Sequence, residues 1–132
     1  NETRDMVITF NGEIYNHREL REELEAKGHV MGSRADTEVL IHGYEEWGEE
    51  LLQKLRGMFA FVIWDKKNKS IFGARDFFGI KPFYYYHRDG AFLFGSEIKS
   101  FLDDLARNYP GIQARSFELS NTFETFPFHP CR

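Results

Sequence analysis

The apolar positions in the first part of the chain follow a helical period. Asn16 can cap a helix with Glu19 as its capping-box partner, and Gly28 is placed to end that helix. A second helix is predicted from about residue 36 to 47, and a short third helix from 49 to 55. The positions expected on the inner faces are Leu20 and Leu24 in the first helix and Val39, Leu40, Gly43, Tyr44 and Trp47 in the second.

The apolar pattern elsewhere is that of strands. Residues 6–10 form an apolar stretch, and residues 58–64 are apolar at every position, which predicts a strand buried on both faces. A turn at 65–69 leads to a returning strand at 70–74. A further pair is predicted at 83–87 and 91–95. Short turns between these pairs indicate antiparallel sheets.

A strand that is dry on both faces, beside amphipathic helices, favours sheet packed on sheet with helices outside. We therefore predict an α+β fold, a four-layer αββα sandwich, with a two-layer α+β fold as the alternative. Ser96 is expected to cap a last short helix through Leu102. Residues 1–102 form the predicted domain. Residues 103–132, which lack a sustained period, are predicted to be a tail or linker.

Composition narrows the function classes. The chain has 132 residues with 17% aromatic side chains, which excludes a disordered chain. A net charge of -4 with interspersed signs argues against nucleic-acid binding, and no apolar run is long enough to cross a membrane. A single cysteine, Cys131, fits a reducing compartment, so we expect a cytoplasmic location. The spacing of His17, His29, His42 and His87 predicts no metal site.

The run Asn11-Gly12-Glu13-Ile14-Tyr15-Asn16, directly after the first predicted strand, is the strongest candidate for chemistry. Asn11 offers an amide donor and acceptor, Gly12 lets the backbone approach a ligand, and Glu13 accepts hydrogen bonds. This set suits a polar, nitrogen-bearing small molecule. The alternative is an ordinary turn, since Asn-Gly is also a turn signal.

Three further clusters stand out. Residues 33–38 contain carboxylates that could bind a ligand ammonium group, although Ser33 or Asp36 could instead cap the second helix. Residues 55–61 are interpreted as a glycine turn into a core strand. Residues 74–85 are interpreted as an architectural turn in which Arg75 and Asp76 form an ion pair and Gly79 adopts a special backbone angle.

Taken in order, these clusters resemble the glutaminase domain of glutamine-hydrolysing asparagine synthetase. That domain is a class II glutamine amidotransferase of the N-terminal-nucleophile hydrolase superfamily. The resembling motifs span about residues 6–102 and comprise Asn11–Asn16, Asp36-Thr37-Glu38, Tyr44–Gly48, Leu55–Phe61, Ala74–Tyr85 and Ser96–Lys99. The family fold is the αββα sandwich.

The resemblance also implies a chemistry. In the family an amino-terminal cysteine thiolate attacks the side-chain amide of L-glutamine and releases ammonia. Asn11 and the N–H of Gly12 match the oxyanion donors. Glu13 matches a residue of the glutamine pocket, and Asp36 the residue that holds the α-amino group. The resemblance implies no metal or cofactor in this domain. It implies Mg-ATP, with aspartate, in a C-terminal synthetase domain.

The sequence lacks the family's nucleophile, since residue 1 is Asn and the only cysteine is Cys131. We therefore expect the domain to begin upstream, the 132-residue chain alone to be inactive, and an exposed sheet edge to favour homo-oligomers. Two other interpretations remain open. One is a non-catalytic module that binds glutamine or scaffolds a partner. The other is a different class II amidotransferase.

Overall fold

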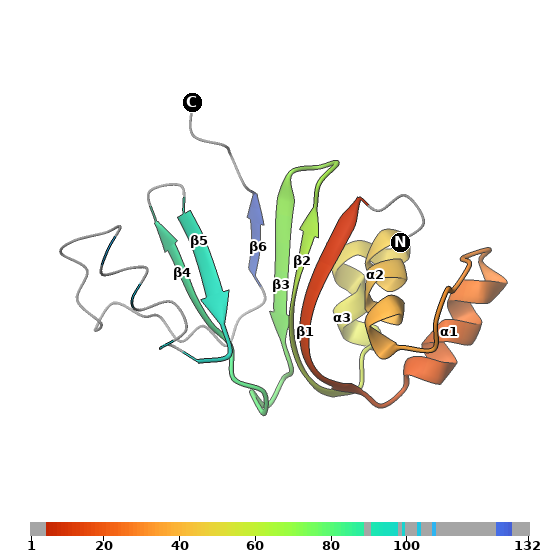
Figure 1. Cartoon of the computed structure of the whole chain (residues 1–132). Helices are drawn as coiled ribbons and strands as arrows, with labels where there is room; N and C mark the ends of the chain where they lie inside the picture. Colours follow the sequence, from red (N-terminus) through yellow and green to blue (C-terminus); the bar gives the residue numbers. More distant parts are fainter. Residues whose placement is uncertain are drawn as a thin grey trace.

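The computed structural model describes residues 5–88, 91–97, 99, 103, 107 and 124–127 of the chain. Its elements, in chain order, are β1 (Met6–Ile14), α1 (His17–Ala26), α2 (Asp36–Trp47), a 3-10 turn η1 (Gly48–Glu50), α3 (Leu51–Lys54), β2 (Gly57–Asp65), β3 (Ser70–Arg75), β4 (Tyr84–Arg88), β5 (Ala91–Gly95) and β6 (Glu124–Pro127). Figure 1 shows α1, α2 and α3 on one side of a central sheet and the β4–β5 hairpin on the other.

The central sheet is antiparallel throughout, in the order β1-β2-β3-β6. As predicted, β2 is buried on both faces, because helices cover one face of the sheet and Phe83 with the β4–β5 hairpin lies over the other. Phe61 and Ile63 belong to the core beneath the helices. Ala60 and Val62, which alternate with them, are buried on the opposite face.

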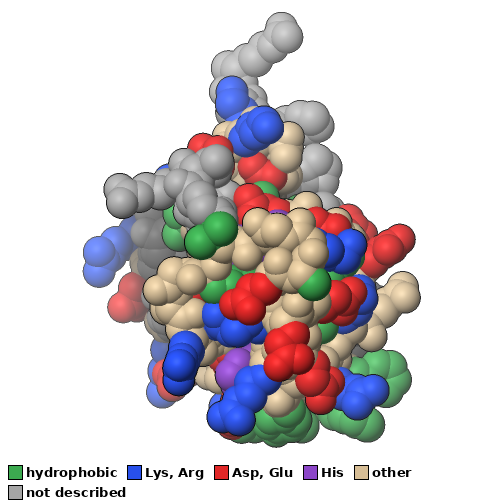
Figure 2. Space-filling view, turned by 90° about the vertical axis from the view of Figure 1, so that its right-hand side faces the viewer, with side chains coloured by type: hydrophobic (Ala, Val, Ile, Leu, Met, Phe, Trp, Pro, Cys, Tyr) green, Lys and Arg blue, Asp and Glu red, His purple; other side chains and the backbone are tan. Residues whose placement is uncertain are grey.

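The helices cover one face of this sheet, as their apolar period predicted. Leu20, Leu24, Val39 and Leu40 are buried in one cluster with the sheet. The outer surfaces of the helices are charged. Figure 2 shows acidic and basic side chains interspersed over this side of the molecule. The bounds of α2 agree with the prediction, whereas the predicted third helix is divided into η1 and α3.

The ends of α1 confirm one prediction and correct another. Gly28, with φ +98°, ends the helix, and the N–H of the following residue, His29, bonds the carbonyl of Leu24. The predicted capping box of Asn16 and Glu19 is wrong, because Asn16 makes no side-chain cap bond. Its amide instead donates to the carbonyl of Lys54 at 2.8 Å and accepts from the N–H of Arg56 at 2.9 Å. The side chain therefore ties the start of α1 to the segment that enters β2.

The β4–β5 hairpin is a separate two-stranded sheet next to the face of the central sheet opposite α1, α2 and α3. Phe83 lies within van der Waals reach of Gly73, since a Cβ built on that glycine would be 3.5 Å from the ring. Sheet therefore packs on sheet, and the α+β class with three of the four predicted layers is present. The predicted helix 96–102 lies mostly outside the described residues.

Four residues of the predicted tail form a strand. Glu124–Pro127 is β6, which pairs with β3 from Gly73 to Ser70. The strand extends the central sheet at its edge, where an unpaired β3 would expose backbone groups. The domain boundary at residue 102 remains a prediction.

The turn between β3 and β4 is architectural, as predicted. The predicted ion pair between Arg75 and Asp76 is not formed. Arg75 donates to the carbonyls of Lys81 and Gly79. Asp76 accepts from the N–H groups of Phe59, Ile80 and Lys81. Both side chains thus bind backbone rather than each other. Gly79, with φ +63°, adopts the left-handed conformation that was predicted for it.

Candidate functional site

The run predicted to follow β1 belongs to the strand itself. β1 continues from Met6 to Ile14, paired with β2 up to Gly57, so Asn11, Gly12 and Glu13 are strand residues and not a turn. This corrects the expectation that the strand ends at Phe10. The consequence is that the backbone of the candidate residues is held rigidly by the adjacent core strand.

Asn11 faces the space between the two sheets. With Thr9, Ala60 and other residues it lines a cavity of about 280 Å³, closed on the other side by Phe83 and Phe94. Its Nδ2 donates to the hydroxyl of Ser96, just after β5, at 3.1 Å. An amide donor in this position is oriented towards a site between the sheets.

The backbone conformation at position 12 requires a glycine. Its φ is +142°, a conformation that L side chains rarely adopt. A Cβ at this position would lie 2.1 Å from the carbonyl oxygen of Met58 and 2.7 Å from the Cα of Phe59. The close approach of β1 and β2 therefore excludes any side chain at this position.

Asp36 reaches the end of β1 from the start of α2. Its Oδ2 accepts a hydrogen bond from the N–H of Ile14 at 3.2 Å. The helix has Ala35 as its N-cap residue, with no side-chain cap bond. The capping interpretation of Asp36 is therefore wrong. The carboxylate is instead bound to the strand that carries Asn11, Gly12 and Glu13.

Glu38 holds the loop before α2, whose N-cap residue makes no side-chain bond. Its carboxylate accepts from the N–H of Gly32 at 2.5 Å, and from the N–H and hydroxyl of Ser33 at 2.7 and 2.6 Å. Burial works to raise the pKa of Glu38, but these hydrogen bonds outweigh it and hold the pKa below its ordinary value. The charged Glu38 fixes the loop that positions Asp36.

The predicted site residues are Asn11, Gly12, Glu13 and Asp36, and the structure brings only some of them into contact. Asp36 and the end of β1 meet through one hydrogen bond, and Glu13 is exposed on the strand next to Gly12. A larger cavity of about 860 Å³, lined by Tyr15, Phe77, Phe78 and neighbours, contains none of the four. We therefore centre the candidate site on the end of β1 and on the smaller cavity.

Sequence reasoning missed two sets of residues. Ser96 was expected to be a helix cap, and its contact with Asn11 was not predicted. His29 and His42 were dismissed as metal ligands by their spacing, yet their Nδ1 atoms are 3.2 Å apart. No local pattern reveals such a pair, because a loop separates the two residues along the chain.

Comparison with known proteins identifies the family. The family model described as a glutamine amidotransferase domain matches residues 1–126. Asparagine synthetase [glutamine-hydrolyzing] 3 of Bacillus subtilis is 46% identical over 96% of this chain, and asparagine synthetase [glutamine-hydrolyzing] 1 of the same organism is 48% identical over 91%. The chain spans about a fifth of the length of these relatives. No helix among the described residues is long and apolar enough to cross a membrane.

Solved structures agree with this result. Glutamine phosphoribosylpyrophosphate amidotransferase from B. subtilis superposes with a TM-score of 0.63 at 26% identity, over 73% of this chain and 22% of that one. A second structure, the allosteric regulatory enzyme of purine biosynthesis, gives a TM-score of 0.62 at 27% identity. With the family model covering almost the whole sequence, these matches show that the chain belongs to the glutamine amidotransferase domain family, with the fold of the N-terminal-nucleophile amidotransferases.

Proposed function

We propose that this domain binds L-glutamine at the end of β1 and supplies the residues that stabilise the reacting amide. The observation that carries the proposal is the hydrogen bond from the N–H of Ile14 to Asp36, 3.2 Å long. It fixes an anion beside a strand whose preceding residues offer the amide donor of Asn11 and the backbone N–H of Gly12. Glutamine presents an amide at one end and an α-ammonium at the other, which requires these two kinds of partner.

Asn11 and Gly12 are the proposed oxyanion donors. Attack of a thiolate on the glutamine amide places a negative charge on the former carbonyl oxygen, and donors aimed at that oxygen lower the barrier. The Nδ2 of Asn11 already faces the space between the sheets and bonds Ser96 at 3.1 Å. The nucleophile is proposed to be the thiol of an amino-terminal cysteine, as in the family mechanism. The one cysteine of the given sequence is Cys131, so this residue is not part of it.

Asp36 is the proposed partner of the α-ammonium group, with Glu13 as a further acceptor. One oxygen of Asp36 is occupied by the N–H of Ile14, and a carboxylate has lone pairs left for a ligand. Both Asp36 and Glu13 are accessible to solvent at least in part, as a binding residue must be. This step needs no metal or cofactor.

The whole protein is proposed to be a glutamine-hydrolysing asparagine synthetase. The relatives with that name share 46% and 48% identity with this chain, whereas the phosphoribosylpyrophosphate amidotransferase shares 26%. In this proposal ammonia passes to a C-terminal synthetase domain, which uses Mg-ATP to activate aspartate. A cytoplasmic location and homo-oligomers are part of the same proposal.

The Asp36→Asn variant of the full-length protein tests the role of Asp36. The amide oxygen of asparagine can still accept from Ile14, so the fold should keep its stability, while the charge is lost. We expect glutamine binding to weaken by about 2–5 kcal/mol, the cost of removing one partner of a buried charge pair. If Asp36 only anchors β1, glutamine affinity measured by calorimetry will stay unchanged, and the proposal is then wrong.

The Asn11→Ala variant tests the oxyanion role independently. An oxyanion donor acts in the transition state, so kcat for glutamate release should fall by roughly 100- to 1000-fold with little change in KM. Synthesis from free ammonia bypasses the glutamine site and should be unaffected, which serves as the control. Equal losses with glutamine and with ammonia would show a general folding defect in place of a lost donor.

A further inference from the structure

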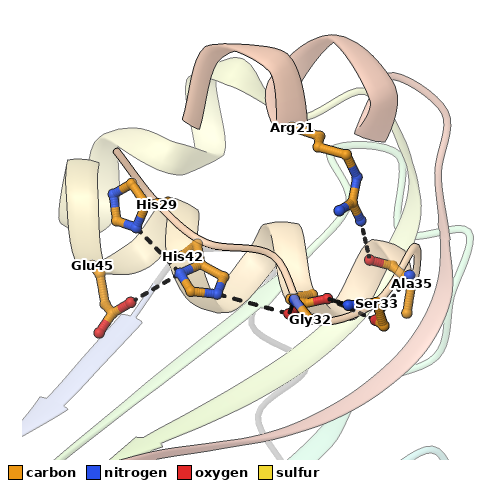
Figure 3. A network of polar contacts seen from close by, with 8 residues as sticks. Arg21, His29, Gly32, Ser33, Ala35, His42 and Glu45 are labelled. Atoms are coloured by element: carbon orange, nitrogen blue, oxygen red, sulfur yellow. Dashed lines mark hydrogen bonds and ion pairs between the residues drawn. The ribbon is translucent and has the colours of Figure 1, made fainter. Parts of the chain in front are cut away.

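Two histidines and a glutamate converge on the helical layer, apart from the proposed glutamine site. His29 follows the end of α1, while His42 and Glu45 lie one turn apart on α2. Figure 3 shows the two imidazole rings edge to face, with dashed lines joining His42 to His29 and to Glu45. One ligand atom from each of the three residues lies within 4.8 Å of the others.

The distances match those of a tetrahedral metal centre. Zinc lies about 2.0–2.1 Å from a histidine nitrogen or a carboxylate oxygen, so two ligand atoms at the tetrahedral angle are about 3.3 Å apart. The Nδ1 atoms of His29 and His42 are 3.2 Å apart, and Nδ1 of His42 is 3.3 Å from Oε2 of Glu45. Two edges of the tetrahedron are therefore already present.

The Nε2 of His29 is oriented by a carboxylate, and a second carboxylate lies near the Nε2 of His42. Nε2 of His29 lies 3.2 Å from Oε2 of Glu46, and Nε2 of His42 lies 4.0 Å from Oε1 of Glu38. Nε2 of His29 can donate its hydrogen to Glu46, which leaves the Nδ1 of that ring as a lone pair directed at His42. Nδ1 of His42 is also 3.3 Å from Oε2 of Glu45, so a cation at this point is within reach of a ligand atom from each of the three residues. Carboxylates that orient the far nitrogen are the usual second partners of metal-bound histidines.

Charge and access also favour a cation. Three carboxylates, those of Glu38, Glu45 and Glu46, lie close to the two rings. Lys27 pairs with one of them, Glu46, at 2.8 Å. His42 is only 1% exposed, but the side chains of His29 and Glu45 are 17% and 24% exposed. An ion can therefore enter from solvent, with the two histidines and Glu45 as three ligands and water as the fourth.

We propose that His29, His42 and Glu45 bind a divalent transition-metal ion, zinc in particular, which joins the end of α1 to α2. Imidazole nitrogens with one carboxylate suit zinc among the available divalent ions. Because a metal that binds only the folded chain stabilises it, the expected role is structural. The site does not include Asp36 or the residues of β1, so it is independent of glutamine binding.

Zinc and cobalt titrations of the chelator-treated full-length protein test the site. We expect a saturable zinc site that raises the Tm, and a cobalt complex with the intense visible absorption of tetrahedral coordination. The His29→Gln and Glu45→Gln variants should each lose affinity by about 100-fold or more, and Glu46→Gln by about 10- to 100-fold through loss of orientation. These residues are partly exposed, so the variants should fold.

Two controls make the result decisive. His87→Gln removes an exposed histidine from β4 and should leave zinc affinity unchanged. Asp36→Asn should also retain zinc, whatever its effect on glutamine. Absence of saturable zinc binding, or zinc affinity and cobalt absorption that are unchanged in His29→Gln, would overturn the proposal. The two nitrogens would then share a proton instead of a metal.

Discussion

Replacing Asp76 by alanine should destabilise the domain strongly, because this one carboxylate satisfies three backbone donors. It is 5% exposed and accepts from Phe59 at 3.2 Å, Ile80 at 2.9 Å and Lys81 at 3.0 Å. A hydrogen bond to a charged group contributes about 1.5–3 kcal/mol, and a buried donor left unpaired costs about 1–3 kcal/mol. The N–H groups of the turn are part-buried and can recover water, so we expect a loss of about 3–5 kcal/mol.

The same carboxylate predicts a pH dependence. Burial works to raise the pKa of Asp76, but the N–H groups of Lys81, Ile80 and Phe59, with the charge of Arg75, lower it below its ordinary value of 3.8. The folded state therefore binds this proton more weakly than the unfolded state. The stabilisation is fully present above pH 3.8 and is lost as the pH falls through the lower, folded pKa.

Urea denaturation at a series of pH values measures both effects. The Asp76→Asn variant should lose about 1–3 kcal/mol at neutral pH, since an amide oxygen keeps part of the bonding. Its free energy of unfolding should fall less steeply below pH 4 than that of the unmodified protein. Glu19→Gln, which removes an exposed carboxylate of α1, is the matched control. An acid slope in Asp76→Asn equal to that of the unmodified protein would refute this account of the turn.

Three further substitutions test the backbone conformations of Gly12 and Gly28 and the anchor at Asn16. Gly12→Ala should destabilise the domain by at least about 3 kcal/mol, because its φ is strained and its Cβ overlaps Met58. Gly28→Ala, with positive φ but open space, should cost only about 1–2 kcal/mol in the same denaturation assay. Asn16→Ala should cost about 1–2 kcal/mol through its two lost bonds, and an unchanged urea midpoint would contradict this.

The sequence predicted the elements well where the signal is local. Apolar spacing gave the bounds of α2, and the uninterrupted run in β2 gave a strand buried on both faces. It failed where polar side chains act over long separations. Asn16 and Asp36 both looked like helix caps, but each binds a distant segment instead. The local propensity of such residues for caps is real, and tertiary contacts replaced it here.

The candidate site shows the same division. The residue types of the run at 11–13 suggested a ligand site, but their continued pairing with β2 could not be foreseen because Asn-Gly is also a turn signal. The nearness of His29 to His42 depends on how α1 packs on α2, which no spacing within the sequence specifies. Contacts between separate elements are set by packing, so a single sequence contains little trace of them.

The polar anchors have a common purpose that follows from their positions. Asn16 binds Lys54 and Arg56 just before β2, Asp36 binds the last residue of β1, and Asp76 binds Phe59 in β2. Three side chains from separate segments of the chain thereby hold two neighbouring strands. An oxyanion donor is effective only when its position is fixed before the reaction, since reorganisation would consume the stabilisation. These anchors therefore account for a rigid β1 end, and their loss should reduce turnover even though none but Asp36 is proposed to contact glutamine.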